Sequence, residues 1–202
     1  MRLLVSGASK LMRELEPHPH LGRLITPHDG GSPSKHIWAA DNAAFSNWNE
    51  LSFLKMVEKI KKAENKPLFV AVPDVVCDSV KTRLLFDKYL PYLGELPLAY
   101  VLQNGVQVED IPWELINAVF VGGDDYFKLR RHVILPLLQV AKQKKKHIHV
   151  GRVNSIRRIS YCRGIGADSI DGTSCSRFPN TYIPVFLKHI ENSVNPQQGF
   201  GL

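Results

Sequence analysis

The sequence predicts an α/β protein built as a small, TIM-like (β/α) barrel. Short, almost continuously apolar segments alternate with amphipathic ones along 202 residues, as in a parallel sheet covered by helices. Polar residues follow nearly every apolar segment, and in a barrel such strand ends converge on one mouth. No Gly-x-Gly-x-x-Gly follows the first segment, which disfavours the alternative of an open dinucleotide-binding sheet.

The predicted strands are rich in Val, Ile, Leu and Phe. They are Arg2–Ser6, Ile37–Asp41, Leu68–Pro73, Leu98–Gln103, Ala118–Gly122, His147–Gly151 and Asp168–Gly172. A barrel of this type has eight strands and usually more than about 200 residues. We therefore expect an eighth strand that is either very short or missing.

Capping residues and apolar stripes predict the helices between these strands. Asn47 can cap a helix over Trp48–Lys62, and Asp78 can cap one over Ser79–Leu90. The remaining helices are expected over Ser155–Arg163, capped by Asn154, over Tyr182–Asn192, with Pro184 in its first turn, and between Asp124 and Lys146, divided or kinked at Pro136.

Two segments do not fit this alternation. Pro17–Lys35 is rich in Pro, His and Gly and is long for a connection, so we interpret it as a functional lid or a mobile loop. Asn195–Leu202 is expected to be a frayed tail. No linker divides the chain, so residues 1–202 are predicted to form one domain.

The composition excludes several classes of protein. Hydrophobic residues make up 44% and charged residues 22%, as in globular proteins, and no apolar run reaches the roughly 18 residues of a membrane span. Cys77, Cys162 and Cys175 are far apart and odd in number, which argues against a disulfide framework. We therefore expect a cytoplasmic protein.

Metal and cofactor chemistry finds little support in the sequence. No Cys-x-x-Cys and no phosphate-binding P-loop are present. His147 and His149 share one strand face, but no acid or cysteine lies near them in the sequence. We expect neither a bound metal nor an organic cofactor.

The distribution of charge points to a polyanionic partner. Lys and Arg number 26 against 19 Asp and Glu, giving +7. The excess lies between Lys142 and Arg177, where only Asp168 and Asp171 oppose it. Such a stretch favours binding to phosphates, so a nucleic acid is the expected partner. The candidate contacts are Lys144, Lys145, Lys146, Arg152, Arg157 and Arg158.

Two carboxylates stand where apolar strands end, Asp41 and Asp171. Each alone is as well explained as a helix cap or turn former. Together at one barrel mouth they suit glycosidic chemistry, in which one carboxylate attacks the anomeric carbon and the other moves protons.

Further strand ends offer groups that suit a purine base. Asp74 can accept from the N–H and amino groups of a guanine-like base, and Gln103 supplies both a donor and an acceptor. Gly122 and Gly123 remove side chains where a flat ring could pack, although a tight turn explains them equally well.

At this point several motifs resemble the tRNA-guanine transglycosylase superfamily, over most of the chain from Trp38 to Thr173. They are HVGRVNS at 149–155, GADSIDGT at 166–173, WAADNAAF at 38–45, VAVPD at 70–74 and VGG at 121–123. The chain is most similar to the short, phage-type DNA-guanine transglycosylases, which put deazaguanines into DNA.

This resemblance implies a role for each candidate residue. Asp171 would be the nucleophile and Asp41 the general acid and base, while Asp74, Gln103, Gly122 and Gly123 would bind the base. The reaction would exchange guanine in DNA for a deazaguanine, with the cyano-substituted queuosine precursor as the expected incoming base.

Two departures from the superfamily matter. The tRNA enzymes carry a Cys/His zinc site after the nucleophile strand, whereas only Cys175 follows here, which favours DNA over tRNA. Ala43 and Ala44 replace a glycine pair, which implies a tighter pocket floor. Three alternatives remain: the same reaction on tRNA, a base-releasing DNA glycosylase, and a non-catalytic nucleic-acid-binding accessory subunit.

Overall fold

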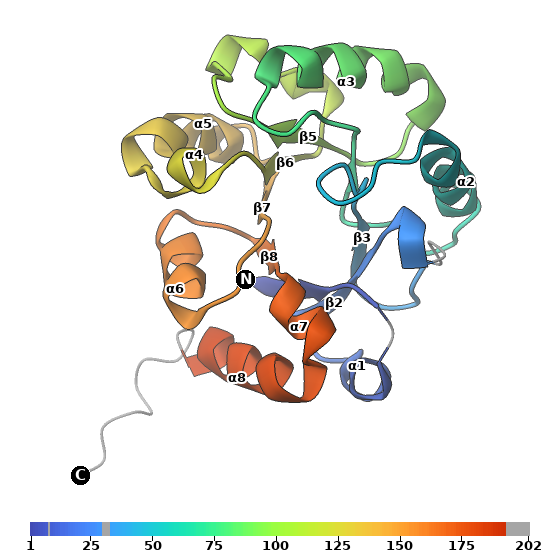
Figure 1. The fold of residues 1–202 in the computed structure, drawn as a ribbon, viewed down its shortest axis with the longest axis vertical. Coiled ribbons are helices and arrows are strands. Elements are labelled where there is room, and N and C mark those ends of the chain that lie inside the picture. Colours follow the sequence, from blue (N-terminus) through green and yellow to red (C-terminus); the bar gives the residue numbers. More distant parts are fainter. Residues whose placement is uncertain (8, 30–32, 193–202) are drawn as a thin grey trace.

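The computed structural model describes residues 1–7, 9–29 and 33–192. Within them the chain forms a closed barrel of eight parallel strands, each paired with the next and β8 paired with β1 (Figure 1). The strands are β1 (Arg2–Val5), β2 (Leu21–Ile25), β3 (Trp38–Ala40), β4 (Val70–Ala71), β5 (Leu98–Leu102), β6 (Ala118–Val121), β7 (His147–Val150) and β8 (Ser169–Asp171). The predicted TIM-like barrel is confirmed.

Helices surround the ring of strands (Figure 1). They are α1 (Lys10–Leu15), α2 (Glu50–Lys61), α3 (Ser79–Leu93), α4 (Asp125–Leu129), α5 (Arg131–Gln143), α6 (Ile156–Gly164), α7 (Thr173–Arg177) and α8 (Pro179–Asn192). Between β5 and β6 the chain forms only the short 3₁₀ helices η2 (Val108–Asp110) and η3 (Trp113–Leu115). In the described part of the β2–β3 connection only the 3₁₀ helix η1 (Pro27–Asp29) is present. These shortened crossovers allow a closed barrel in few residues.

The strand that was absent from the predicted set is β2, and it lies inside the segment interpreted as a lid or mobile loop. β2 pairs with β1 and β3 in the middle of Pro17–Lys35. Gly22 and Arg23 interrupt its apolar character, which is why the sequence pattern missed it. A Cβ on Gly22 would lie 2.8 Å from both the Ile37 carbonyl oxygen and Leu4 Cδ2, so close packing requires a glycine there.

Two predicted helix caps are displaced. Asn49, not Asn47, caps α2 by accepting from the Ser52 N–H at 2.8 Å, so Trp48 precedes the helix. Ser155, not Asn154, caps α6. The Asn154 side chain instead accepts from the Ser174 N–H at 2.9 Å, in the first turn of α7. The predicted Asp78 cap of α3 is confirmed, with the Lys81 N–H at 2.9 Å.

Prolines divide the later helices less than expected. The stretch between Asp124 and Lys146 is split at Arg130, and Pro136 lies within α5. The last helix begins at Pro179, so Pro184 lies beyond its first turn. The expected frayed tail, Asn195–Leu202, lies outside the described residues.

The core has two layers, one between the strands and the helices and one inside the barrel. The inner layer is small and consists of Leu4, Leu24, Ala39, Phe69, Ala99 and Ala118, with Phe120 packed against it. Three of these residues are alanines, whose small side chains leave space in the barrel. The polar side chains of His149, on β7, and Ser169, on β8, are fully buried. In the described residues no helix has the length and apolar character needed to cross a membrane.

Candidate active site

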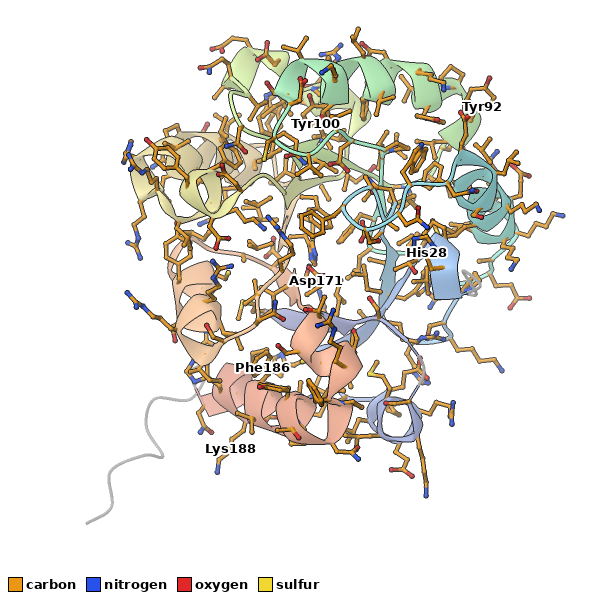
Figure 2. The ribbon with its side chains drawn as sticks, viewed as in Figure 1. His28, Tyr92, Tyr100, Asp171, Phe186 and Lys188 are labelled. Carbon is orange, nitrogen blue, oxygen red and sulfur yellow. The ribbon has the colours of Figure 1, made fainter. Side chains whose placement is uncertain are left out.

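A cavity of about 270 Å³ opens at the carboxyl ends of the strands. This is close to the lower end of the range for small-molecule sites, about 300–1,000 Å³. Every residue predicted to act in catalysis or to bind the base lines it: Asp41, Asp74, Gln103, Gly122, Gly123 and Asp171. In Figure 2 Asp171 lies near the middle of the ring, whereas Lys188 and Tyr92 lie on the outer helices.

Asp171 ends β8 and is held through one of its two oxygens. Oδ1 accepts from the backbone N–H of Arg152 at 3.1 Å and lies 3.3 Å from Nε2 of His149. Among the described residues no hydrogen bond reaches Oδ2, and the side chain is 18% exposed. Asp171 therefore presents one unoccupied carboxylate oxygen.

Asp41 follows β3, and its surroundings disfavour a negative charge. Burial, the negative charge of Asp171 and then that of Asp74 raise its pKa to about 7, against smaller opposing effects of the Ala43 and Asn42 N–H groups. The two carboxyl groups therefore lie in one pocket in unlike surroundings, and only those of Asp41 favour the protonated form. Such a difference is typical of an acid and a nucleophile that work as a pair.

Asp74 is held between two amides. Its Oδ1 accepts from Asn42 at 2.8 Å and its Oδ2 from Gln103 at 2.7 Å. Gln103 is itself fixed, because its Oε1 accepts from the Cys77 N–H at 2.8 Å. Burial raises the pKa of Asp74, while the two amide hydrogen bonds oppose that shift. Each carboxylate oxygen keeps a second lone pair that could accept from a ligand.

Gly122 and Gly123 are required by space as well as by backbone conformation. A Cβ on Gly122 would lie 2.7 Å from Gln103 Nε2 and 2.8 Å from Val101 Cγ1. Gly123 has a φ of 69°, in the left-handed region that favours glycine. The pair keeps the pocket wall beside Gln103 free of side chains.

Three non-glycine residues with a left-handed backbone lie on loops around this pocket: Ala43, Cys77 and Arg152, with φ values of 60°, 62° and 61°. Such conformations cost about 1–3 kcal/mol and concentrate at functional sites. Ala43 stands where the resembled superfamily has glycine. At Arg152 the strained backbone directs its N–H to Asp171.

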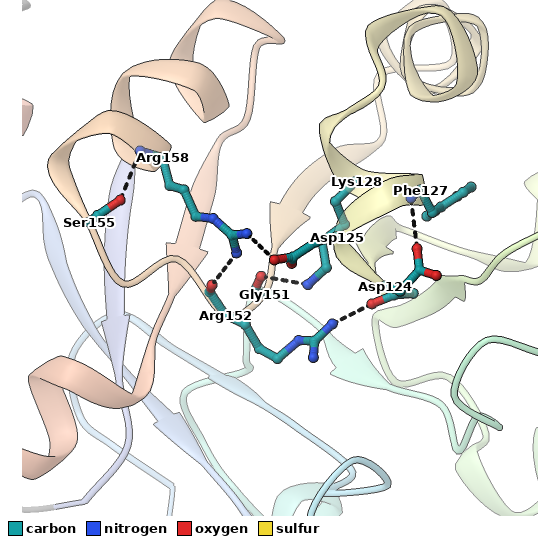
Figure 3. Close-up of polar contacts among 9 residues, drawn as sticks. Asp124, Asp125, Phe127, Lys128, Gly151, Arg152, Ser155 and Arg158 are labelled. Carbon is teal, nitrogen blue, oxygen red and sulfur yellow. Dashed lines mark hydrogen bonds and ion pairs between the residues drawn. The ribbon is translucent and has the colours of Figure 1, made fainter.

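Arg152 spans the rim of the pocket. Its guanidinium donates to the Gly123 carbonyl and lies 4.3 Å from the centre of the exposed Phe45 ring. Arg158 donates to the Arg152 carbonyl at 3.3 Å and pairs with Asp125, as Figure 3 shows. The loop after β7 is thus tied to α4 across the opening.

Lys128 is a pocket residue that the sequence did not reveal. It is 3% exposed, and its Nζ donates to the Gly151 carbonyl at 3.0 Å (Figure 3). Burial and then the charge of Arg152 lower its pKa to about 8. In the sequence Lys128 stands among the charged residues of an amphipathic segment, so nothing distinguished it from a solvated lysine.

The structure divides the predicted basic surface. Arg152, Arg157 and Arg158 follow β7 and lie on the side of the pocket. Lys144, Lys145 and Lys146 precede β7, and Lys144 pairs at 2.8 Å with Glu114, which precedes β6. The three lysines therefore lie at the other end of the barrel, and we leave them out of the interface proposed below.

His149 does have an acid near it in space. Asp171 comes from the neighbouring strand β8, which sequence distance concealed. Within residues 1–7, 9–29 and 33–192, no group of three or more His, Cys, Asp and Glu side chains is arranged to hold a metal ion.

Comparison with known proteins adds no family. No protein-family model matches this sequence, and no curated protein is significantly similar to it. The fold defines a TIM-like barrel, and the pocket at its mouth carries a pair of carboxyl groups with unlike surroundings.

Proposed function

We propose that this protein is a glycosyl-transfer enzyme that exchanges guanine in DNA for a deazaguanine base. The observation that carries the proposal is the meeting of Asp41 and Asp171 in one cavity, where the surroundings of Asp41 raise its pKa to about 7. The resemblance of the strand-end motifs to guanine transglycosylases supplies the choice of base.

The chemistry needs one nucleophile and one proton carrier. Asp171 Oδ2 attacks C1′ of the target deoxynucleoside, the C1′–N9 bond breaks, and Asp41 gives its proton to the departing guanine. The incoming base then returns a proton to Asp41 as its N9 displaces Asp171 from C1′. A carboxyl group with a pKa of about 7 suits both transfers near neutral pH.

Base selection follows from the side of the pocket that carries Asp74. Guanine and deazaguanines offer N1–H and an amino group, for which the free lone pairs of Asp74 are acceptors. Gln103 holds Asp74 in place, and the bare wall of Gly122 and Gly123 leaves space for a planar ring. A base lacking these donors would leave the remaining lone pairs of Asp74 without hydrogen bonds, so adenine is expected to be rejected.

The surroundings of the pocket support a nucleic-acid substrate. A base within a duplex has to be flipped out to reach a cavity of this kind, at a cost of a few kcal/mol. Arg152 and Phe45 at the rim offer a cation and an exposed ring against which nucleotides can stack. Arg157 is exposed in the first turn of α6, which follows the β7 loop, and can contact phosphate.

The test is a base-exchange assay with duplex DNA, tRNA and radiolabelled guanine, followed by exchange against the cyano-deazaguanine. Wild-type protein is expected to incorporate label into DNA. Asp171→Asn and Asp41→Asn are each expected to lose at least about 10³-fold in rate. Asp87→Asn is the matched control, because this exposed carboxylate pairs with Arg83 on α3, away from the pocket.

Each other outcome identifies an alternative. Label entering only tRNA would make the substrate tRNA, and abasic sites without incorporation would make the protein a glycosylase. Salt-sensitive DNA binding without turnover would leave an accessory subunit. Full exchange by Asp171→Asn would refute the proposed nucleophile.

A further inference from the structure

A line of polar side chains runs through the barrel interior beneath Asp171. Nε2 of His149 lies 3.3 Å from Asp171 Oδ1, and Nδ1 of the same ring lies 2.8 Å from the Ser169 hydroxyl. That hydroxyl lies 2.7 Å from Nε2 of His147. Side chains alternate between the two faces along each strand. His147 and His149 therefore share the inward face of β7, and Ser169 and Asp171 share the inward face of the neighbouring strand β8.

The line is packed into the core. His149 has no exposed surface, and its ring lies 4.5 Å from the centre of Phe120 and 5.0 Å from that of Phe69. Ser169 is also fully buried. Polar groups in such surroundings are costly unless each is hydrogen-bonded, and every one of these side chains has a partner.

As the proposed nucleophile, Asp171 acts as a carboxylate, and this sets the direction of these hydrogen bonds. A carboxylate can only accept, so Nε2 of His149 carries the proton between them. In a neutral imidazole Nδ1 is then an acceptor, and it accepts a hydrogen bond from the Ser169 hydroxyl. The Ser169 oxygen in turn accepts from Nε2 of His147.

We propose that His149 is a positioning residue for the nucleophile, holding Oδ1 of Asp171 so that Oδ2 is the oxygen that attacks C1′. Ser169 and His147 keep the imidazole of His149 in the orientation that this requires. The inference rests on the proposed function for its kinetic consequence, but the direction of the hydrogen bonds can be tested without it.

The surroundings of His147 agree with a neutral ring at the far end of the line. Burial, followed by the neighbouring His149, lowers the pKa of His147 to about 4. Asp168 opposes this shift, whereas Arg2 and the N-terminal amine add to it. At neutral pH His147 therefore carries one ring proton, as a donor to Ser169 requires.

The first test is nuclear magnetic resonance of wild-type protein labelled with ¹⁵N in its histidine rings, assigned with His147→Gln and His149→Gln. The expected result is a proton on Nε2 of both rings at pH 7, with Nδ1 of His149 unprotonated. A His149 ring without a proton on Nε2 would overturn the proposal, because it could not donate to Asp171. This result does not depend on any activity.

The second test compares His149→Leu with His149→Gln. Leucine fills similar space without a donor, whereas the glutamine amide can place an N–H near the position of Nε2. Because misplacing a reacting group by about 1 Å can cost about 10²-fold in rate, we expect kcat to fall by about 10-fold to 100-fold in His149→Leu. KM should change little, and His149→Gln should recover part of the loss.

The pH profile separates positioning from a structural role. Removing a donor from a carboxylate favours its protonated form, so the acidic limb of kcat should move to higher pH in His149→Leu. Ile148→Val is the matched control, because this buried side chain lies in the outer core layer. Equal losses in the leucine and glutamine variants with an unmoved acidic limb would overturn the proposal. A wild type without exchange would refute the proposed function instead, leaving the resonance result to stand.

Discussion

Asp41 and Asp171 show how surroundings give the same side chain different chemistry. Asp171 ends its strand with one oxygen held by the Arg152 N–H and lying 3.3 Å from Nε2 of His149. Asp41 is surrounded by protein and faces two other carboxylates, which disfavour a further charge. The difference belongs to the positions and not to the residue type.

The raised pKa of Asp41 predicts a pH-dependent gain in stability for Asp41→Asn. Its pKa rises from 3.8 to about 7, so the folded protein binds more protons than the unfolded chain between these values. Asp41 therefore destabilises the fold increasingly as pH rises through that window, and not at all below it. Urea unfolding should show Asp41→Asn more stable by about 1–3 kcal/mol at pH 8 and about equal to wild type at pH 4. A gain that is the same at both pH values would contradict this cause.

Lys128 predicts a separation of stability from activity. Its lowered pKa means that the buried ammonium costs folding free energy below about pH 8, partly offset by its hydrogen bond to Gly151. Lys128→Met keeps the apolar stem and removes the charge. We expect the free energy of unfolding at pH 7 to be unchanged or raised by about 1–2 kcal/mol. Base exchange should be at least tenfold slower, because Lys128 lines the pocket and holds the Gly151 carbonyl. A melting temperature lowered by several degrees would show that the ammonium stabilises the fold.

At the scale of single elements, the loop after each strand determines the pocket more than the strand does. The β3 loop contributes Asp41 and Phe45, the β4 loop Asp74, and the β7 loop Arg152. Their strained residues lie in loops that are held by a strand at one end and a helix at the other. The helices that follow these loops begin at residues whose side chains accept from first-turn N–H groups: Asn49, Asp78 and Ser155.

The C-terminus of α5 offers a stability test of one such element. Lys145 has a φ of 54°, and the N–H groups of Lys145 and Lys146 return to the carbonyls of Lys142 and Ala141. This is the helix end at which glycine is preferred. Lys145→Gly should raise the free energy of unfolding by about 0.5–1 kcal/mol, or the melting temperature by about 2–4 °C. A Lys145→Ala variant, which keeps the strain, should show no such gain.

At the scale of the whole molecule, the barrel gives the two ends of β7 different surroundings. The end that carries Arg157 adjoins the pocket, whereas the end that carries Lys144 lies away from it. By charge alone Arg157 and Lys144 are equivalent. They differ because one follows β7 and the other precedes it, so they lie at opposite ends of the barrel.

This polarity predicts unequal effects on DNA binding. Arg157→Gln should weaken binding and reduce the slope of log K against log salt by about 1, as expected for one lost phosphate contact. Lys144→Gln removes the same charge at the other end and should leave both quantities unchanged. Titrations of a fluorescent duplex at several salt concentrations would measure this. Equal effects of the two substitutions would place the DNA elsewhere.

Much of the barrel was predictable because buried parallel strands are locally apolar. Seven strands and the polar residues that end them followed from this pattern, including Asp41, Asp74 and Asp171. β2 was missed because Gly22 is selected by contact with Leu4 and Ile37, which are distant in sequence. Lys128 and the His149–Asp171 contact were missed for the same reason, since burial and partner depend on other elements.

The sequence by itself determined the fold class and the set of candidate residues, because strand hydrophobicity and strand-end polarity are local properties. Only the tertiary structure decided that six of these residues share one cavity, that the basic residues divide between two ends, and that the pKa of Asp41 is raised. The physical reason is that desolvation and charge–charge interaction depend on distance in space. Closing the barrel sets those distances.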